Sequence, residues 1–171
     1  LAVSLLLSFS GLASVDSKPV LVDAGGHKLK VLHIGQGNST VIFDSGFSDT
    51  LEAWFKIQPE IAKLTTTVSY DRAGLGGSEI GPSPRSAKQI VTELKVVLDN
   101  IGVSPPYVLV GWSGGGLFQT VFAATYPDDV AALILVDPAT AEHYDYMQST
   151  VEWSNAFEAL EVLKTLRVKR L

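Results

Sequence analysis

The stretch Tyr107-Val-Leu-Val-Gly111-Trp-Ser113-Gly-Gly115 decides the fold of this chain. It contains the pattern G-x-S-x-G, with an apolar run before it and an apolar helical face after it (Leu117, Phe118, Val121, Phe122). This order predicts a nucleophile elbow, a tight turn that raises a serine hydroxyl above the end of a sheet. Glycine is expected at 111 and 115 because a Cβ there would collide with neighbouring backbone. A phosphate-binding loop is disfavoured because neither G-x-x-x-x-G-K-[ST] nor G-x-G-x-x-G occurs.

Length and composition limit the class of protein. The chain has 171 residues, 46% of them hydrophobic and 18% charged, which predicts one compact domain. A net charge of -5 gives no electrostatic support for binding nucleic acid. The chain has no cysteine, and its three histidines (His27, His33, His143) lie far apart. Disulfides and thiol chemistry are therefore excluded, and we expect neither a metal nor another cofactor.

Strands and helices are expected to alternate from residue 39 to residue 137. The predicted strands are 19–23, 28–33, 40–43, 66–70, 107–110 and 130–136. Helical patterns lie between them, near 51–64, 86–101 and 114–126. This alternation predicts an α/β fold with a mostly parallel sheet and helices on both faces. Ligands bind at the carboxyl ends of such strands, where Asp44, Asp71, Ser113 and Asp137 are expected.

The two ends of the chain differ from the middle in composition. Residues 1–14 are apolar and small, with Gly11 and Ala13 placed as in a secretory signal. They are expected to be a signal or anchor remnant, or alternatively a buried strand. The protein would then be exported to the periplasm or secreted, or held at a membrane by this segment alone. Residues 15–140 form the predicted core, and 141–171 read as the start of a cap.

Three motifs in succession resemble the α/β-hydrolase superfamily. They are Phe43-Asp-Ser-Gly-Phe47, then Tyr70-Asp-Arg-Ala-Gly-Leu-Gly-Gly-Ser78, then the elbow at Ser113. The resemblance covers about residues 20 to 140. The first motif departs from the pattern, since Ser45 stands where many members have histidine.

This resemblance implies site residues. Ser113 would be the nucleophile, and the backbone N–H of Gly114 would be one oxyanion donor. The N–H of Phe47 would be the second donor, and the change at Ser45 leaves that backbone group in place. Asp71 and Arg72 would fix their loop by hydrogen bonds. A small-molecule acyl compound would be the substrate.

The acid and the base are harder to assign. Asp137 follows the sixth strand, where some members carry the acid, although the acid more often follows a seventh. His143 is the one histidine after Ser113, and it is more simply read as a surface residue at a cap hinge. The family usually has eight strands, so the resemblance implies that the chain is truncated after the sixth core strand and lacks the catalytic histidine. Such a chain is expected to be nearly inactive, since losing the histidine costs about 10⁶ in kcat.

Two functions from different classes follow. The first is hydrolysis of a small carboxylic ester or related acyl compound through a serine nucleophile. Serine at the elbow argues against the dehalogenase and epoxide-hydrolase branches, which use aspartate there. The alternative is a non-catalytic binding protein on an α/β-hydrolase scaffold.

Overall fold

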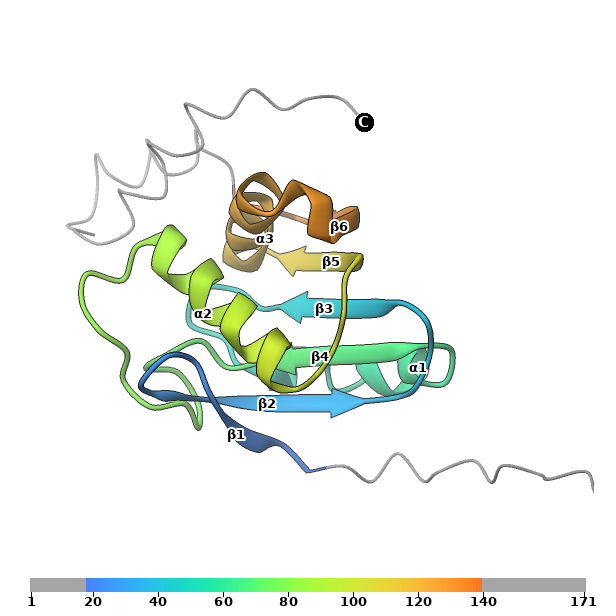
Figure 1. Cartoon of the computed structure of the whole chain (residues 1–171), viewed down its shortest axis with the longest axis horizontal. Helices are drawn as coiled ribbons and strands as arrows, with labels where there is room; N and C mark the ends of the chain where they lie inside the picture. The colour runs from blue at the N-terminus through green and yellow to red at the C-terminus, as the bar shows by residue number, and fades with distance from the viewer. Residues whose placement is uncertain (1–17, 140–171) are drawn as a thin grey trace, which may run out of the picture.

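The computed structural model describes residues 18–139 and places them around one six-stranded sheet (Figure 1). The strands are β1 (Val20–Asp23), β2 (Lys28–Ile34), β3 (Thr40–Asp44), β4 (Thr66–Tyr70), β5 (Tyr107–Trp112) and β6 (Val130–Val136). The helices are η1 (Leu51–Trp54), α1 (Gln58–Ala62), α2 (Ala87–Asn100), α3 (Gly114–Thr125) and η2 (Pro127–Asp129). The predicted strands are all present.

The sheet runs in the order β1-β2-β4-β3-β5-β6. β1 and β2 form an antiparallel hairpin, and β2 also pairs antiparallel with β4. The remaining neighbours, β4 with β3, β3 with β5 and β5 with β6, are parallel. The predicted fold class, a mostly parallel sheet, is confirmed. Because β3, β4, β5 and β6 run parallel, their carboxyl ends lie at the same end of the sheet.

Helices cover both faces of the sheet. α2 and α3 pack on one face, where the main core gathers inward residues such as Ile42, Leu94, Leu109 and Phe122. On the other face a smaller cluster joins Phe43, Trp54 and Val110. The alternation along β3, with Ile42 in one cluster and Phe43 in the other, follows from the two-residue period of a strand. β5 is apolar on both sides because each side is packed, whereas β4 carries the buried Thr67 and Ser69, which hydrogen-bond to Gln58.

The ends of α2 show how local sequence fixes a helix. The side chain of Ser86 accepts a hydrogen bond from the Gln89 N–H at 3.2 Å, as an N-cap. The side-chain amide of Gln89 donates to Glu93, so the capping relation is not reciprocal. At the other end Gly102 has φ +73°, and the Val103 N–H reaches back to the Leu98 carbonyl. This is the glycine-dependent Schellman ending.

β6 lies at one edge of the sheet and is unusually exposed. Ile134, Leu135 and Val136 are 49%, 43% and 43% exposed. Within residues 18–139 no further strand pairs with the outer side of β6. None of the helices in this part of the chain is long and apolar enough to cross a membrane. The segments 1–14 and 141–171 lie outside the described residues, so the division into three parts stays a prediction.

Candidate active site

Ser113 stands between the end of β5 and the start of α3 in a conformation that few L-residues adopt. Its φ is 51° and its ψ is -120°. Three backbone hydrogen bonds hold it there: its N–H donates to the Val136 carbonyl at 3.1 Å, and its carbonyl accepts from Gly116 and Ala139 at 3.0 and 2.9 Å. Non-glycine residues in such conformations cost about 1–3 kcal/mol and cluster at functional sites. The turn is therefore an elbow in geometry, while the chemical role of Ser113 stays a prediction.

The glycines around Ser113 are required by backbone contacts. A Cβ on Gly111 would lie 2.5 Å from the Cα of Gly116. A Cβ on Gly115 would lie 2.2 Å from the carbonyl oxygen of Asp44 and 2.7 Å from that of Ser45. These distances are below any normal carbon contact, and the opposing atoms belong to backbone that cannot rotate away. The G-x-S-x-G spacing therefore lets β5, α3 and the end of β3 approach one another.

The loop after β3 borders the elbow, as the resemblance implies for the second oxyanion donor. A Cβ on Gly46 would lie 3.7 Å from the Cβ of Ser113, and a Cβ on Gly114 would lie 2.7 Å from the ring of Phe47. That ring also packs edge-on against Phe118, with centroids 5.7 Å apart. The structure thus brings Phe47 and Gly114 together beside Ser113. The oxyanion role of their N–H groups stays a prediction.

Ser45, which departs from the family pattern, has a local structural role. Its side chain is buried, and its hydroxyl donates to the Thr50 carbonyl at 2.8 Å. That bond closes the turn between β3 and η1. A hydroxyl at this position therefore supports the loop from within.

Arg72 occupies the inner side of the same loop. Its guanidinium donates to the carbonyls of Ser45, Gly46 and Phe47 and forms an ion pair with Asp44. The side chain is 5% exposed, and its guanidinium carbon lies 5.1 Å from the centroid of the Phe118 ring. A buried cation with this many fixed partners is rigid.

Asp44 is the charge partner of Arg72 and is completely buried. Burial raises the pKa of its carboxyl, and this rise is opposed by Arg72 and by the Tyr70 hydroxyl, which donates to it at 2.7 Å. Burial together with the Asp44 charge raises the pKa of Tyr70 well above its ordinary value, so the phenol stays a donor. Sequence reasoning named Asp44 only by its place at a strand end and missed this network. The signal was present, since a carboxylate that ends an otherwise apolar strand needs a partner.

Asp71 fixes the next loop. Its carboxylate accepts from the backbone N–H of Leu51 at 2.7 Å and from that of Gly77 at 3.0 Å. It is fully buried, and Lys30 lies 3.7 Å away. Asp71 therefore ties η1 to the glycine-rich segment 74–78, which agrees with the positioning role implied for it.

Asp137, the candidate acid, lies directly after β6. It is exposed and has φ +43°, and Ser113 is the one other non-glycine residue with positive φ among residues 18–139. Trp112 and Val136 are register partners, so Asp137 and Ser113 follow neighbouring strand ends. This register, together with the hydrogen bonds from Ser113 to Val136 and from Ala139 to Ser113, places Asp137 near the elbow. No hydrogen bond to a histidine is described for it within residues 18–139.

The two histidines that the structure describes lie elsewhere. Nε2 of His27 is buried and lies 3.2 Å from Oε1 of Glu93, which Arg85 also binds. His33 lies on β2 and lines a groove beside Thr40 and Thr66, at the amino ends of β3 and β4. His143 is outside the described residues. The general base is therefore not found among residues 18–139.

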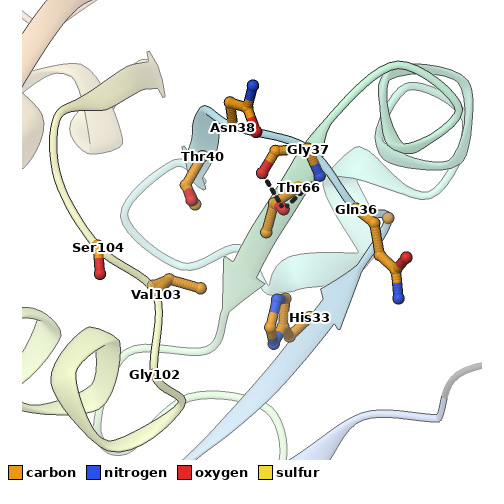
Figure 2. A pocket seen from close by; sticks show the side chains of 10 residues that line it. His33, Gln36, Gly37, Asn38, Thr40, Thr66, Gly102, Val103 and Ser104 are labelled. Atoms are coloured by element: carbon orange, nitrogen blue, oxygen red, sulfur yellow. Dashed lines mark hydrogen bonds between the residues drawn. The ribbon is translucent and has the colours of Figure 1, made fainter.

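A polar groove of about 460 Å³ lies at the amino ends of the parallel strands (Figure 2). Ser113 follows the carboxyl end of β5, at the other end of these strands. Its lining includes His33, Asn38, Thr40, Thr66 and Ser104. The Thr66 hydroxyl accepts a hydrogen bond from the Gly37 N–H and donates one to the Gly37 carbonyl. The groove contains no nucleophile paired with a base. Within the described residues no cluster of His, Cys, Asp or Glu could hold a metal ion either.

Comparison with known proteins agrees with this geometry. The family described as alpha/beta hydrolase fold matches residues 39–161. The protein YqjL of Bacillus subtilis, itself uncharacterised, is 32% identical over 108 residues, which cover 63% of this chain and 43% of YqjL. A bovine (lyso)-N-acylphosphatidylethanolamine lipase is 31% identical over 97 residues, or 54% of this chain and 28% of the lipase.

Among solved structures, the epoxide hydrolase CorEH superposes with a TM-score of 0.66 at 21% identity. The superposition covers 71% of this chain and 42% of CorEH, and at this identity it shows a shared fold alone. The chain therefore spans about two fifths of the length of YqjL and of CorEH. It belongs to the α/β-hydrolase family.

Proposed function

From this family membership we propose that the chain carries the nucleophile and the oxyanion site of a serine hydrolase that acts on a small carboxylic ester or related acyl compound. The observation that carries the proposal is the strained Ser113, held at the carboxyl edge of the sheet between glycines that backbone contacts require. A serine hydroxyl so placed is exposed to a substrate at the sheet edge. The bovine relative named as a lipase for an N-acylated phospholipid supports acyl chemistry.

In this proposal each residue has one role. Ser113 attacks the acyl carbon, and the N–H groups of Gly114 and Phe47 stabilise the charge that develops on the carbonyl oxygen. Each such donor is worth about 10²–10³ in kcat. Asp137 is the candidate acid that orients the base. His143 is the first histidine to test as the base, followed by any other histidine of the full-length protein.

A fluorophosphonate probe tests the nucleophile directly, because it reacts with an activated serine. In the full-length protein the probe is expected to label Ser113, and Ser113→Ala is expected to abolish labelling. Ser104→Ala is the matched control, since Ser104 is exposed in the groove at the amino ends of the strands, at the other end of the sheet from Ser113. Equal labelling of Ser113→Ala and the parent would refute the assignment.

The second candidate is a binding protein that keeps the hydrolase scaffold without turnover. It is favoured by one observation, that neither His27 nor His33 lies at the elbow. In that case the full-length protein would bind an acyl ligand, fail to label with the probe, and lose no activity on Ser113→Ala. The labelling experiment therefore separates the two functions.

A further inference from the structure

The three carbonyl groups that Arg72 holds belong to consecutive peptide units of one loop. Nη1 donates to the Ser45 carbonyl at 2.7 Å, and Nη2 donates to the Phe47 carbonyl at 3.0 Å and to the Gly46 carbonyl. A single side chain therefore contacts three consecutive peptide planes, and the Asp49 N–H donates to the Gly46 carbonyl as well, at 3.1 Å. The loop curls around the guanidinium with its carbonyl oxygens turned inward.

The direction of the N–H groups follows from peptide geometry. In a trans peptide the C=O of one residue and the N–H of the next share one plane and point in opposite directions. The Gly46 carbonyl and the Phe47 N–H are such a pair. Because the carbonyl points at Arg72, the Phe47 N–H points away from it, on the loop that borders Ser113.

We infer that Arg72 is a positioning residue that aims the Phe47 N–H at the oxyanion by clamping the carbonyl of the same peptide. This inference rests on the proposed function and extends it to a residue that does not touch substrate. Hydrogen bonding at the carbonyl also polarises the peptide and strengthens its N–H as a donor, by about 10–30% per bond. Arg72 thus acts on both the direction and the strength of the donor.

The surroundings of Arg72 keep the clamp rigid. Asp44 neutralises the charge, so the guanidinium does not compete for the anionic substrate oxygen. The Phe118 ring faces the guanidinium, and the same ring packs against Phe47. Asp44 is itself held by Tyr70 and lies 3.5 Å from the Gln119 amide nitrogen. The loop is therefore fixed from one side by a prearranged set of buried contacts.

Lysine at position 72 separates charge from geometry. A lysine would keep the positive charge beside Asp44, but its single ammonium nitrogen lacks the planar fork that spans several carbonyls. Arg72→Lys therefore removes the clamp while limiting the electrostatic cost. Arg85→Lys is the matched control, because Arg85 binds the buried Glu93 with a similar fork and lies outside the proposed machinery.

The experiment measures p-nitrophenyl acetate turnover and the backbone amide of Phe47 by NMR in the full-length protein. Arg72→Lys is expected to lower kcat by about 10-fold to 10²-fold with KM nearly unchanged, up to the loss of one oxyanion donor. The Phe47 amide is expected to shift and to exchange its proton faster. Arg85→Lys is expected to change none of these.

Each outcome decides between the alternatives. A lower melting temperature with unchanged kcat and an unchanged Phe47 amide would make Arg72 structural only and overturn the inference. A shifted amide with unchanged turnover would show that the Phe47 N–H is not the donor, which also overturns it. If the parent shows no Ser113-dependent turnover while the amide shifts, the proposed function fails and the clamp geometry stands.

A measurement on the unsubstituted protein covers the case in which Arg72→Lys does not fold. Scalar couplings across hydrogen bonds, from the Arg72 Nη atoms to the carbonyl carbons of Ser45, Gly46 and Phe47, report the clamp directly. Their presence supports the inference. Their absence overturns it without any substitution.

Discussion

Replacing Gly115 by alanine tests the elbow with one added methyl group. The Cβ would lie 2.2 Å from the Asp44 carbonyl oxygen, 2.5 Å from its carbonyl carbon and 2.7 Å from the Ser45 oxygen. All three are backbone atoms. Asp44 is in register with Gly111 of β5, and the Ser45 carbonyl is held by Arg72. The chain could therefore avoid the clash with the alanine Cβ only by breaking the β3–β5 pairing or the contacts of the loop after β3.

The free energy of unfolding that Gly115→Ala is expected to lose follows from the rigidity of the backbone atoms that its Cβ would meet. Overpacking costs about 1–3 kcal/mol where side chains can adjust, so a clash with fixed backbone is expected at about 3 kcal/mol or more. For a domain of this size each kcal/mol lowers the melting temperature by about 2–4 °C, which gives a fall of about 6–12 °C. Circular dichroism melting of the full-length protein measures this shift, with denaturant unfolding as a second assay.

Gly77→Ala is the matched control for this substitution. A Cβ on Gly77 would meet the Cδ of Lys30 at 2.7 Å, which is the far part of a flexible and partly exposed side chain. Its cost is therefore expected to stay below about 1 kcal/mol. If Gly115→Ala melts together with Gly77→Ala and the parent, α3 does not approach β3 as described and the elbow geometry is wrong.

Three further predictions concern pH, the sheet edge and the N-terminus. Partial burial lowers the pKa of His33, so the unfolded chain takes up a proton on this residue before the folded chain does as the pH falls below about 6.5. The folded state is therefore destabilised at low pH. The fall in urea midpoint between pH 8 and pH 5 is expected to be smaller in His33→Gln than in the parent, and equal falls would contradict this. The exposed apolar edge of β6 is expected to drive self-association of the 171-residue chain, so Leu135→Lys is expected to increase the monomeric fraction in size-exclusion chromatography; a chain that is already monomeric would refute it. The apolar segment 1–13 predicts a mature N-terminus near Ser14 in the exported protein, and N-terminal sequencing that finds Leu5 retained in a soluble form would favour the alternative of a buried strand.

Local patterns in the sequence were enough to predict the strands and the elbow. The run 107–110 became β5 because a strand buried between helices has to be apolar on both faces. The apolar run 130–136 became β6, the edge strand, which is partly exposed within residues 18–139. The helix predicted near 86–101 ends just before Gly102, whose positive φ favours glycine. These features depend on residues that are close together in the sequence.

Features that depend on distant residues could not be predicted in the same way. Nothing local to Lys28–Ile34 states that β2 adds to β4 rather than to β3. Glu93 is a charged residue at a core-facing position of α2, three residues after Ile90. It is buried there because Arg85, Gln89 and His27, which lie elsewhere in the sequence or on the same helix, surround its carboxylate. The pairing of Asp44 with Arg72 likewise joins two motifs that sequence reasoning treated separately.

The magnitude of catalysis decides what the described residues could do alone. A serine hydrolase that keeps its oxyanion site but has lost its triad still accelerates the reaction by about 10³–10⁴ over the rate in water. Losing the histidine of such a triad lowers kcat by about 10⁶. Nε2 of His27 lies 3.2 Å from Glu93, and His33 lines the groove at the amino ends of the strands, so neither is placed to act as base for Ser113. A Ser113-dependent rate far above the residual therefore requires a histidine outside residues 18–139. Replacing His143 first, and then each other histidine of the full-length protein, identifies it by a loss of turnover that leaves the elbow folded.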